Sequence, residues 1–220
     1  MGLGDTFYIK SLEIIGTRKT LSIETLSPLL AALSGEIFIN ENLDLRSYIG
    51  IMIISISLFI LLRQRTNLLV NNLNINIEQN NIRIYVFPFL SVLCAVSGGL
   101  LSRIVFLKSD LSPFQTTEIR LLGAIIFLTI IKKFKINFFL NKLDSNNQKR
   151  FLLSIFLGTN LGILLQQIVF KTLPLGIGWT LLSTSPIISL FFATKEEEKI
   201  TKGIVFCTTL LFLGLCLIII

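Results

Sequence analysis

The 220-residue sequence contains no histidine, and this absence removes the commonest metal ligand and general base of enzymes. Cysteine is scarce as well, and Cys94, Cys207 and Cys216 all lie in apolar runs without the spacing of a metal or redox site. The G-x-x-x-x-G-K-[ST] pattern of phosphate-binding loops is also missing, so nothing indicates hydrolysis of ATP. We therefore expect no catalytic residues, no metal, no cofactor and no enzyme activity.

Polar residues are too few for a soluble domain. Hydrophobic residues make up 52% of the chain, 18 of its residues are phenylalanine, and its mean hydropathy is +0.78. About 20 apolar residues cross a bilayer as a helix, and several runs approach this length. The net charge of +7 comes from Lys and Arg placed between the apolar runs, which indicates membrane topology signals rather than nucleic-acid binding. The sequence therefore predicts an all-α polytopic membrane protein.

The apolar runs predict the helices. A short segment over 3–16 is only half as long as a spanning helix and is followed by helices over 20–39 and 50–62. A polar, Asn-rich segment over 65–83 then indicates a linker. Beyond it we expect five further helices, over 84–107, 112–131, 151–172, 175–194 and 203–220.

One stretch of the chain occurs twice. The pairs Ser27-Pro28 and Ser185-Pro186 each lie inside an apolar segment, and their prolines are 158 residues apart. In both copies acidic residues close the segment, and a second apolar segment with an early glycine follows, Gly50 or Gly203. An internal repeat built from apolar helices is typical of secondary transporters.

The two copies of this repeat are unequal in length. Residues 84–220 hold five expected helices, whereas residues 1–64 hold two and a half. If the repeat unit has five helices, the chain is a ten-helix protein truncated at its N-terminus, with about 7–8 of ten transmembrane segments present. A complete seven-helix protein is the alternative. In the truncated ten-helix interpretation, the chain consists of the end of a first repeat (1–64), a polar linker (65–83) and a second repeat (84–220).

The order of these features resembles the EamA family of the drug/metabolite transporter superfamily. The first copy matches the family pattern at Pro28, Gly35, Glu41, Leu43 and Gly50. The second copy matches it at Arg120, Gly123, Ser185-Pro186 and Gly203. The resemblance implies inverted five-helix repeats, the first of them incomplete here, with a substrate cavity between the two bundles.

The resemblance also implies a function. We expect a permease that moves a small organic metabolite, amino-acid-like or drug-like, by alternating access. Its expected partners are the lipid bilayer and the small-molecule substrate, with no nucleic acid and with a homodimer left open. The expected location is the plasma membrane of a prokaryote, as a multi-pass protein. A truncated remnant without transport and a small-multidrug-type proton-coupled exporter are the alternatives.

Glu24 is the first candidate for the site, because an ionisable group inside a bilayer is costly and therefore functional by default. It lies one helical turn before Pro28, which removes a helix hydrogen bond and frees the Glu24 carbonyl oxygen. The Glu24 carboxylate can bind a cationic substrate group or a coupling proton. The alternative is that Glu24 lies near a helix end and serves as a cap or extends to the interface.

The other candidates are polar residues or helix breaks within apolar segments. Asp5 and Tyr8 are candidates to line the cavity, and Gln166 and Gln167 can bind substrate or link helices. Trp179, the single tryptophan, is read as an interfacial anchor. The helix breaks that we expect to line the cavity involve Ser27, Pro28, Ser185 and Pro186.

Overall fold

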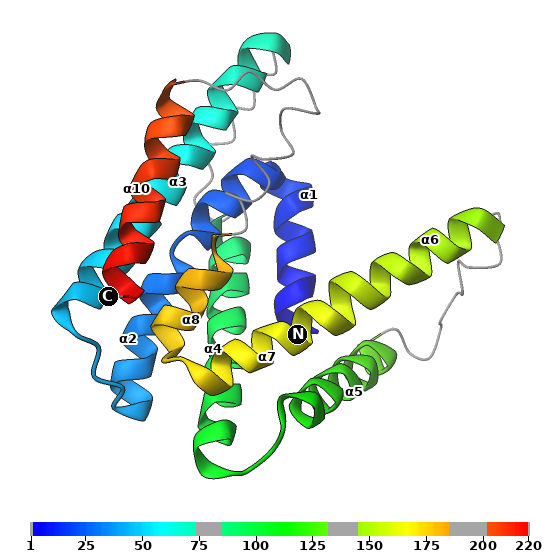
Figure 1. The fold of residues 1–220 in the computed structure, drawn as a ribbon. Helices are drawn as coiled ribbons and strands as arrows, with labels where there is room; N and C mark the ends of the chain where they lie inside the picture. The colour runs from blue at the N-terminus through cyan, green and yellow to red at the C-terminus, as the bar shows by residue number, and fades with distance from the viewer. Residues whose placement is uncertain (1, 74–84, 132–144, 185–201, 220) are drawn as a thin grey trace. The chain divides into compact units, whose positions relative to one another are not determined.

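The computed structural model describes residues 2–73, 85–131, 145–184 and 202–219, and every regular element within these ranges is helical (Figure 1). The described helices fall into two compact units. One unit comprises Leu3–Leu100 and Pro174–Ile220, and the other comprises Leu101–Leu173 with the first two residues. Each unit is considered by itself below.

Four helical stretches within the described ranges are long and apolar enough to cross a membrane: Thr20–Ile39, Val86–Lys108, Pro113–Ile131 and Asn147–Thr172. Two shorter apolar helical stretches, Leu45–Ile60 and Phe206–Ile218, accompany them. The prediction of an all-α polytopic membrane protein is therefore confirmed.

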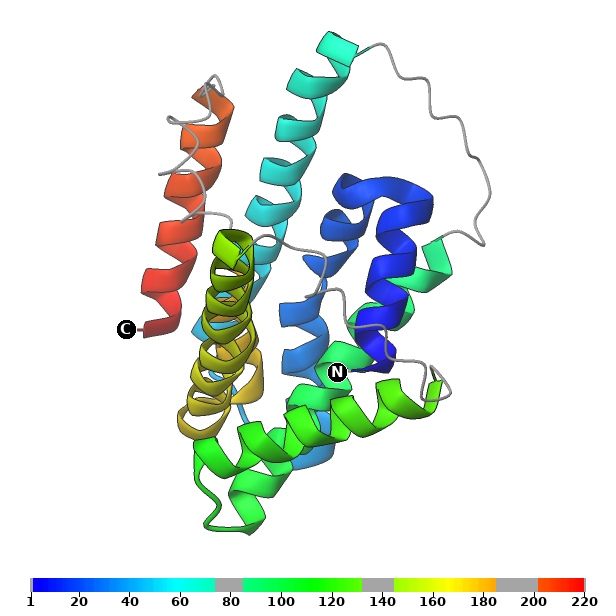
Figure 2. The same ribbon diagram turned by 90° about the vertical axis from the view of Figure 1, so that its right-hand side faces the viewer.

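Helix α1, Leu3–Glu24, is not a straight rod but doubles back on itself (Figure 2). The cause is Gly16, whose φ of 80° and ψ of 163° suit glycine because it has no Cβ atom. A side-chain hydrogen bond joins the two arms, since Ser11 Oγ donates to Thr20 Oγ1 over 3.1 Å. Thr20 Oγ1 in turn donates to the carbonyl of Gly16, at the bend itself, over 3.0 Å. The break predicted at the end of the segment 3–16 is therefore present.

Helix α2, Ser27–Ile39, packs closely against helix α8, Leu175–Leu182. The contact depends on small residues, because a Cβ atom added to Gly176 would lie 2.7 Å from Ala32 Cβ. Beyond the end of α2, the chain turns at Asn40 in the left-handed conformation, and Glu41 Oε2 accepts a hydrogen bond of 2.7 Å from the Leu175 backbone N–H. Glu41 thus ties the loop after α2 to the first residue of α8.

Helices α3, Leu45–Leu73, and α10, Lys202–Ile219, lie side by side (Figure 1). Their backbones meet at two glycines, because a Cβ atom added to Gly50 would lie 2.9 Å from the Gly214 carbonyl oxygen. Close approach of this kind is typical of small residues at membrane helix contacts. The buried cluster between the two helices consists of Ile54, Leu58, Cys207 and Leu211.

The bounds of α3 differ from those predicted. The helix begins before Gly50 and continues to Leu73, so residues 65–73 of the expected polar linker are helical. The sequence from residue 51 to residue 73 contains neither Pro nor Gly, and nothing local stops the helix where the apolar run ends.

The second unit contains the end of α4, Val86–Lys108, and then α5, Pro113–Ile131, which starts with a capping box. The Ser112 backbone N–H donates to Gln115 Oε1 over 2.9 Å, and the Gln115 backbone N–H donates to Ser112 Oγ over 3.2 Å. The remaining helix is continuous through α6 (Ser145–Ile155), a π-helical segment (Phe156–Leu161) and α7 (Gly162–Thr172). Arg103 donates to the carbonyls of Phe170 and Lys171 at its end.

Candidate functional site

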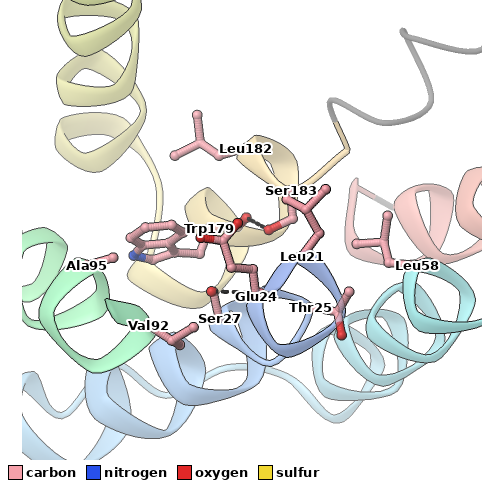
Figure 3. Close-up of a pocket in the computed structure, with 10 residues that line it drawn as sticks. All are labelled: Leu21, Glu24, Thr25, Ser27, Leu58, Val92, Ala95, Trp179, Leu182 and Ser183. Carbon is pink, nitrogen blue, oxygen red and sulfur yellow. Dashed lines mark hydrogen bonds between the residues drawn. The ribbon is translucent and has the colours of Figure 1, made fainter. Parts of the chain in front are cut away.

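A cavity of about 270 Å³ lies within the unit formed by Leu3–Leu100 and Pro174–Ile220. Its walls come from α1, the turn after it, α2, α3, α4 and α8 (Figure 3). The described residues that line it are Leu21, Glu24, Thr25, Ser27, Leu58, Val92, Ala95, Trp179, Leu182 and Ser183.

Glu24 is the one ionisable side chain among these described lining residues. It is the last residue of α1, it is half-buried, and its side chain extends toward Trp179 and Ser183 of the α8 region (Figure 3). Within the described part of the chain, its carboxylate has no ion pair or hydrogen bond. The site therefore contains a carboxylate that is partly shielded from water.

The backbone at Glu24 is interrupted. Helix α1 ends at Glu24 and α2 begins at Ser27, with the buried Pro28 in the first turn of α2. Proline has no N–H to donate to the Glu24 carbonyl, and Ser27 Oγ donates to this carbonyl instead, over 2.7 Å. The predicted break before Pro28 is present, and the free end of α1 places the Glu24 side chain in the cavity wall.

The remaining two lining hydroxyls are also donors to the backbone. Thr25 Oγ1 donates to the Ser22 carbonyl over 2.7 Å, and Ser183 Oγ donates to the Trp179 carbonyl over 2.8 Å. Since each hydroxyl proton is used in this way, the lone pairs of the hydroxyl oxygens are what each group can offer to a ligand.

Trp179 forms part of the cavity wall on the α8 side, although its position near a segment start indicated an interfacial anchor (Figure 3). The internal repeat contains the signal that identifies it. The offset of 158 residues pairs Leu21 with Trp179 and Glu24 with Leu182, and all four residues line the cavity. Equivalent positions of the two repeats therefore face the same cavity. The acid, Glu24, and the aromatic ring, Trp179, do not occupy equivalent positions in the two repeats.

The other predicted site residues that the structure describes are not among the residues lining this cavity. Asp5 is exposed on the first arm of α1, and Tyr8, on the same arm, interacts electrostatically with Glu24. Gln166 and Gln167 belong to α7 in the other unit, where the fully buried Gln167 amide makes no hydrogen bond within the described residues. Ser185 and Pro186 lie outside the described residues.

Comparisons with known proteins place the chain in a family. The model of the EamA-like transporter family matches residues 1–63 and 82–220, which is most of the chain. A search of curated proteins and a search of solved structures find no significant match. By the extent of the family match, this chain belongs to the EamA-like transporter family of the drug/metabolite transporter superfamily, and it is a multi-pass membrane transporter of that type.

Proposed function

We propose that the chain moves a small organic metabolite across the membrane by secondary, alternating-access transport, and that the cavity at Glu24 binds this substrate. One observation carries the proposal: a carboxylate within the apolar stretch Thr20–Ile39 lines a cavity of about 270 Å³ in a member of a transporter family. A carboxylate in such a stretch is costly unless it has a function.

The helix breaks around the cavity support the same function. Interrupted helices commonly surround the substrate sites of secondary transporters, because unwound backbone is tolerated in a membrane protein only where it lines a cavity or is buried. The arm of α1 that carries Glu24 starts after the break at Gly16 and ends at the break before Ser27. This short arm is the element that we expect to move between the two access states.

The sequence and the exposed side chains support a proposal about the energy source of transport and the lipid contacts of the protein. Because the sequence has no phosphate-binding loop, we propose that transport is driven by a gradient or by exchange of solutes, and that the chain catalyses no chemical reaction. The exposed apolar side chains, among them Ile37, Phe38 and Phe114, are proposed to contact lipid. We propose the plasma membrane of a prokaryote as the location.

Transport by purified protein in liposomes tests the proposal. The full chain is reconstituted, and the uptake of a panel of small amines, amino acids and neutral metabolites is measured with an imposed solute gradient or a proton gradient. We expect uptake of at least one compound, and we expect Glu24→Gln to lower its initial rate by about tenfold or more, because an interaction with a charged partner is lost.

Glu13→Gln is the matched control, since Glu13 is exposed on the other arm of α1 and does not line the cavity. This variant should transport at the wild-type rate. If no compound moves under any gradient, although the protein is folded and correctly inserted, the proposed function is wrong and the interpretation as a remnant without transport gains support.

A further inference from the structure

The polar atoms that line the cavity define the kind of ligand it accepts. We propose that the ligand is a small primary ammonium ion with an apolar body, held by the Glu24 carboxylate and the face of Trp179. The inference rests on the proposed transport site and names the chemical class of its substrate.

The residues that line the cavity carry a negative charge. Glu24 is the only charged side chain among the described lining residues, and none of them is Lys or Arg. Among these described residues an anion would find no positive partner, and an amino-acid zwitterion would bury its carboxylate beside that of Glu24. A cation is the ligand whose charge these residues can neutralise.

The hydrogen-bonding groups favour the same class. The hydroxyls of Thr25, Ser27 and Ser183 all donate to backbone carbonyls, so their oxygens are left as acceptors. With the Glu24 carboxylate they form a set of acceptors, and this set matches an ammonium group, which has three N–H donors and no acceptor. A quaternary ammonium ion would leave these acceptors without a donor.

The Trp179 ring supplies an aromatic surface. Figure 3 shows the ring across the cavity from Leu58, with the indole nitrogen on the side of α4, and the nitrogen atom is buried. The part of the indole that can meet a ligand is therefore its ring, which attracts cations electrostatically. The repeat-related position is Leu21, so only one repeat supplies such a ring.

The size of the cavity limits the ligand. Its volume of about 270 Å³ lies just below the range of roughly 300–1,000 Å³ that is typical of sites for drug-sized molecules. It equals the space of about nine water molecules, which corresponds to a ligand of on the order of ten non-hydrogen atoms. The aliphatic wall of Leu21, Leu58, Val92, Ala95 and Leu182 suits an apolar body of this size.

A matched series of four compounds tests the class of ligand. They share a phenyl ring and a short chain: 2-phenylethylammonium, L-phenylalanine, 3-phenylpropionate and 2-phenylethanol. Trp179 is the only tryptophan in the chain, so the intrinsic fluorescence of the full-length protein in detergent reports from the cavity wall. We expect a saturable fluorescence change with 2-phenylethylammonium and affinities at least tenfold weaker for the other three compounds.

Variants then assign the interaction to residues. Glu24→Gln should weaken 2-phenylethylammonium binding about 10- to 100-fold, and Glu13→Gln should leave it unchanged. Trp179→Leu, measured by calorimetry, should weaken it about 2- to 30-fold, and Trp179→Phe should retain most of the affinity. If Glu24→Gln does not fold, the four compounds on the wild-type protein decide by themselves.

The inference is overturned if any of the other three compounds binds as tightly as the amine, if none of the four compounds binds, or if a folded Glu24→Gln variant keeps full affinity for the amine. Its failure is distinguishable from failure of the proposed function. Amine binding that depends on Glu24 but is not followed by uptake into liposomes refutes transport alone. Uptake of an anion or a zwitterion through the Glu24 cavity refutes the ammonium class alone.

Discussion

Glu41 links the first half of the chain to the wall of the cavity, and its replacement by alanine should loosen helix α8. The Glu41 carboxylate accepts the Leu175 backbone N–H over 2.7 Å, and Leu175 is fully buried at the first turn of α8. About one turn and about two turns further along the same helix, Trp179 and Leu182 line the cavity. A weaker attachment of α8 therefore changes both the stability of the protein and the shape of its candidate site.

The size of the effect follows from the geometry of this contact. A hydrogen bond to a charged acceptor contributes about 1.5–3 kcal/mol. A negative charge at a helix N-terminus adds about 0.3–1 kcal/mol at exposed positions. Glu41 is only half-buried, so we expect Glu41→Ala to lower the free energy of unfolding by about 2 kcal/mol. Glu41→Gln keeps an acceptor oxygen and should cost about 1 kcal/mol.

Thermal unfolding in detergent, followed by the fluorescence of Trp179, measures the effect, and hydrogen exchange shows where it occurs. For a chain of this size 2 kcal/mol corresponds to a decrease in Tm of about 4–8 °C. The backbone amides of α8 should exchange faster in Glu41→Ala, while those of α5 should not change. Asp44→Asn is the matched control, because Asp44 is an exposed acid in the same loop.

Two results would refute this reasoning. If Glu41→Ala unfolds at the same temperature as Asp44→Asn, the contact with Leu175 does not stabilise α8. If α8 exchanges at the wild-type rate while Tm falls, Glu41 acts elsewhere in the fold.

Two further predictions concern glycines whose replacement acts through different physical effects. Gly16→Ala should destabilise the protein by about 1–3 kcal/mol, because φ of 80° and ψ of 163° are strained for alanine. The structure leaves open space for the methyl group, so the effect comes from the backbone alone. Denaturant titration measures it, and an unchanged midpoint would contradict the bent form of α1. Gly176→Ala should cost about 1–3 kcal/mol by overpacking, because the new Cβ atom would lie 2.7 Å from Ala32 Cβ. The double variant Gly176→Ala with Ala32→Gly should recover part of this loss, and thermal unfolding of the single and double variants would show whether the two positions are coupled.

Much of the helical framework was predictable from the sequence. The predicted segments 112–131 and 151–172 correspond to Pro113–Ile131 and to most of the apolar helix Asn147–Thr172. The breaks in the first copy were predictable because Gly and Pro act through their own covalent structure, whatever surrounds them. The end of α3 was not, because a helix without Pro or Gly can continue beyond its apolar run.

The candidate site was also predictable only in part from the sequence. Glu24 could be named from the sequence, because a carboxylate in an apolar run is costly wherever the run packs. The cavity itself depended on the tertiary structure, which brings Trp179 and Ser183 next to a helix end more than 150 residues earlier in the chain. Gln167, which the sequence left open as a substrate-binding or a helix-linking residue, is buried in a different unit. Apolar patterns and helix breaks are local properties of the chain, whereas the choice of which helix faces meet depends on the fit of side chains far apart in sequence, such as Gly176 against Ala32.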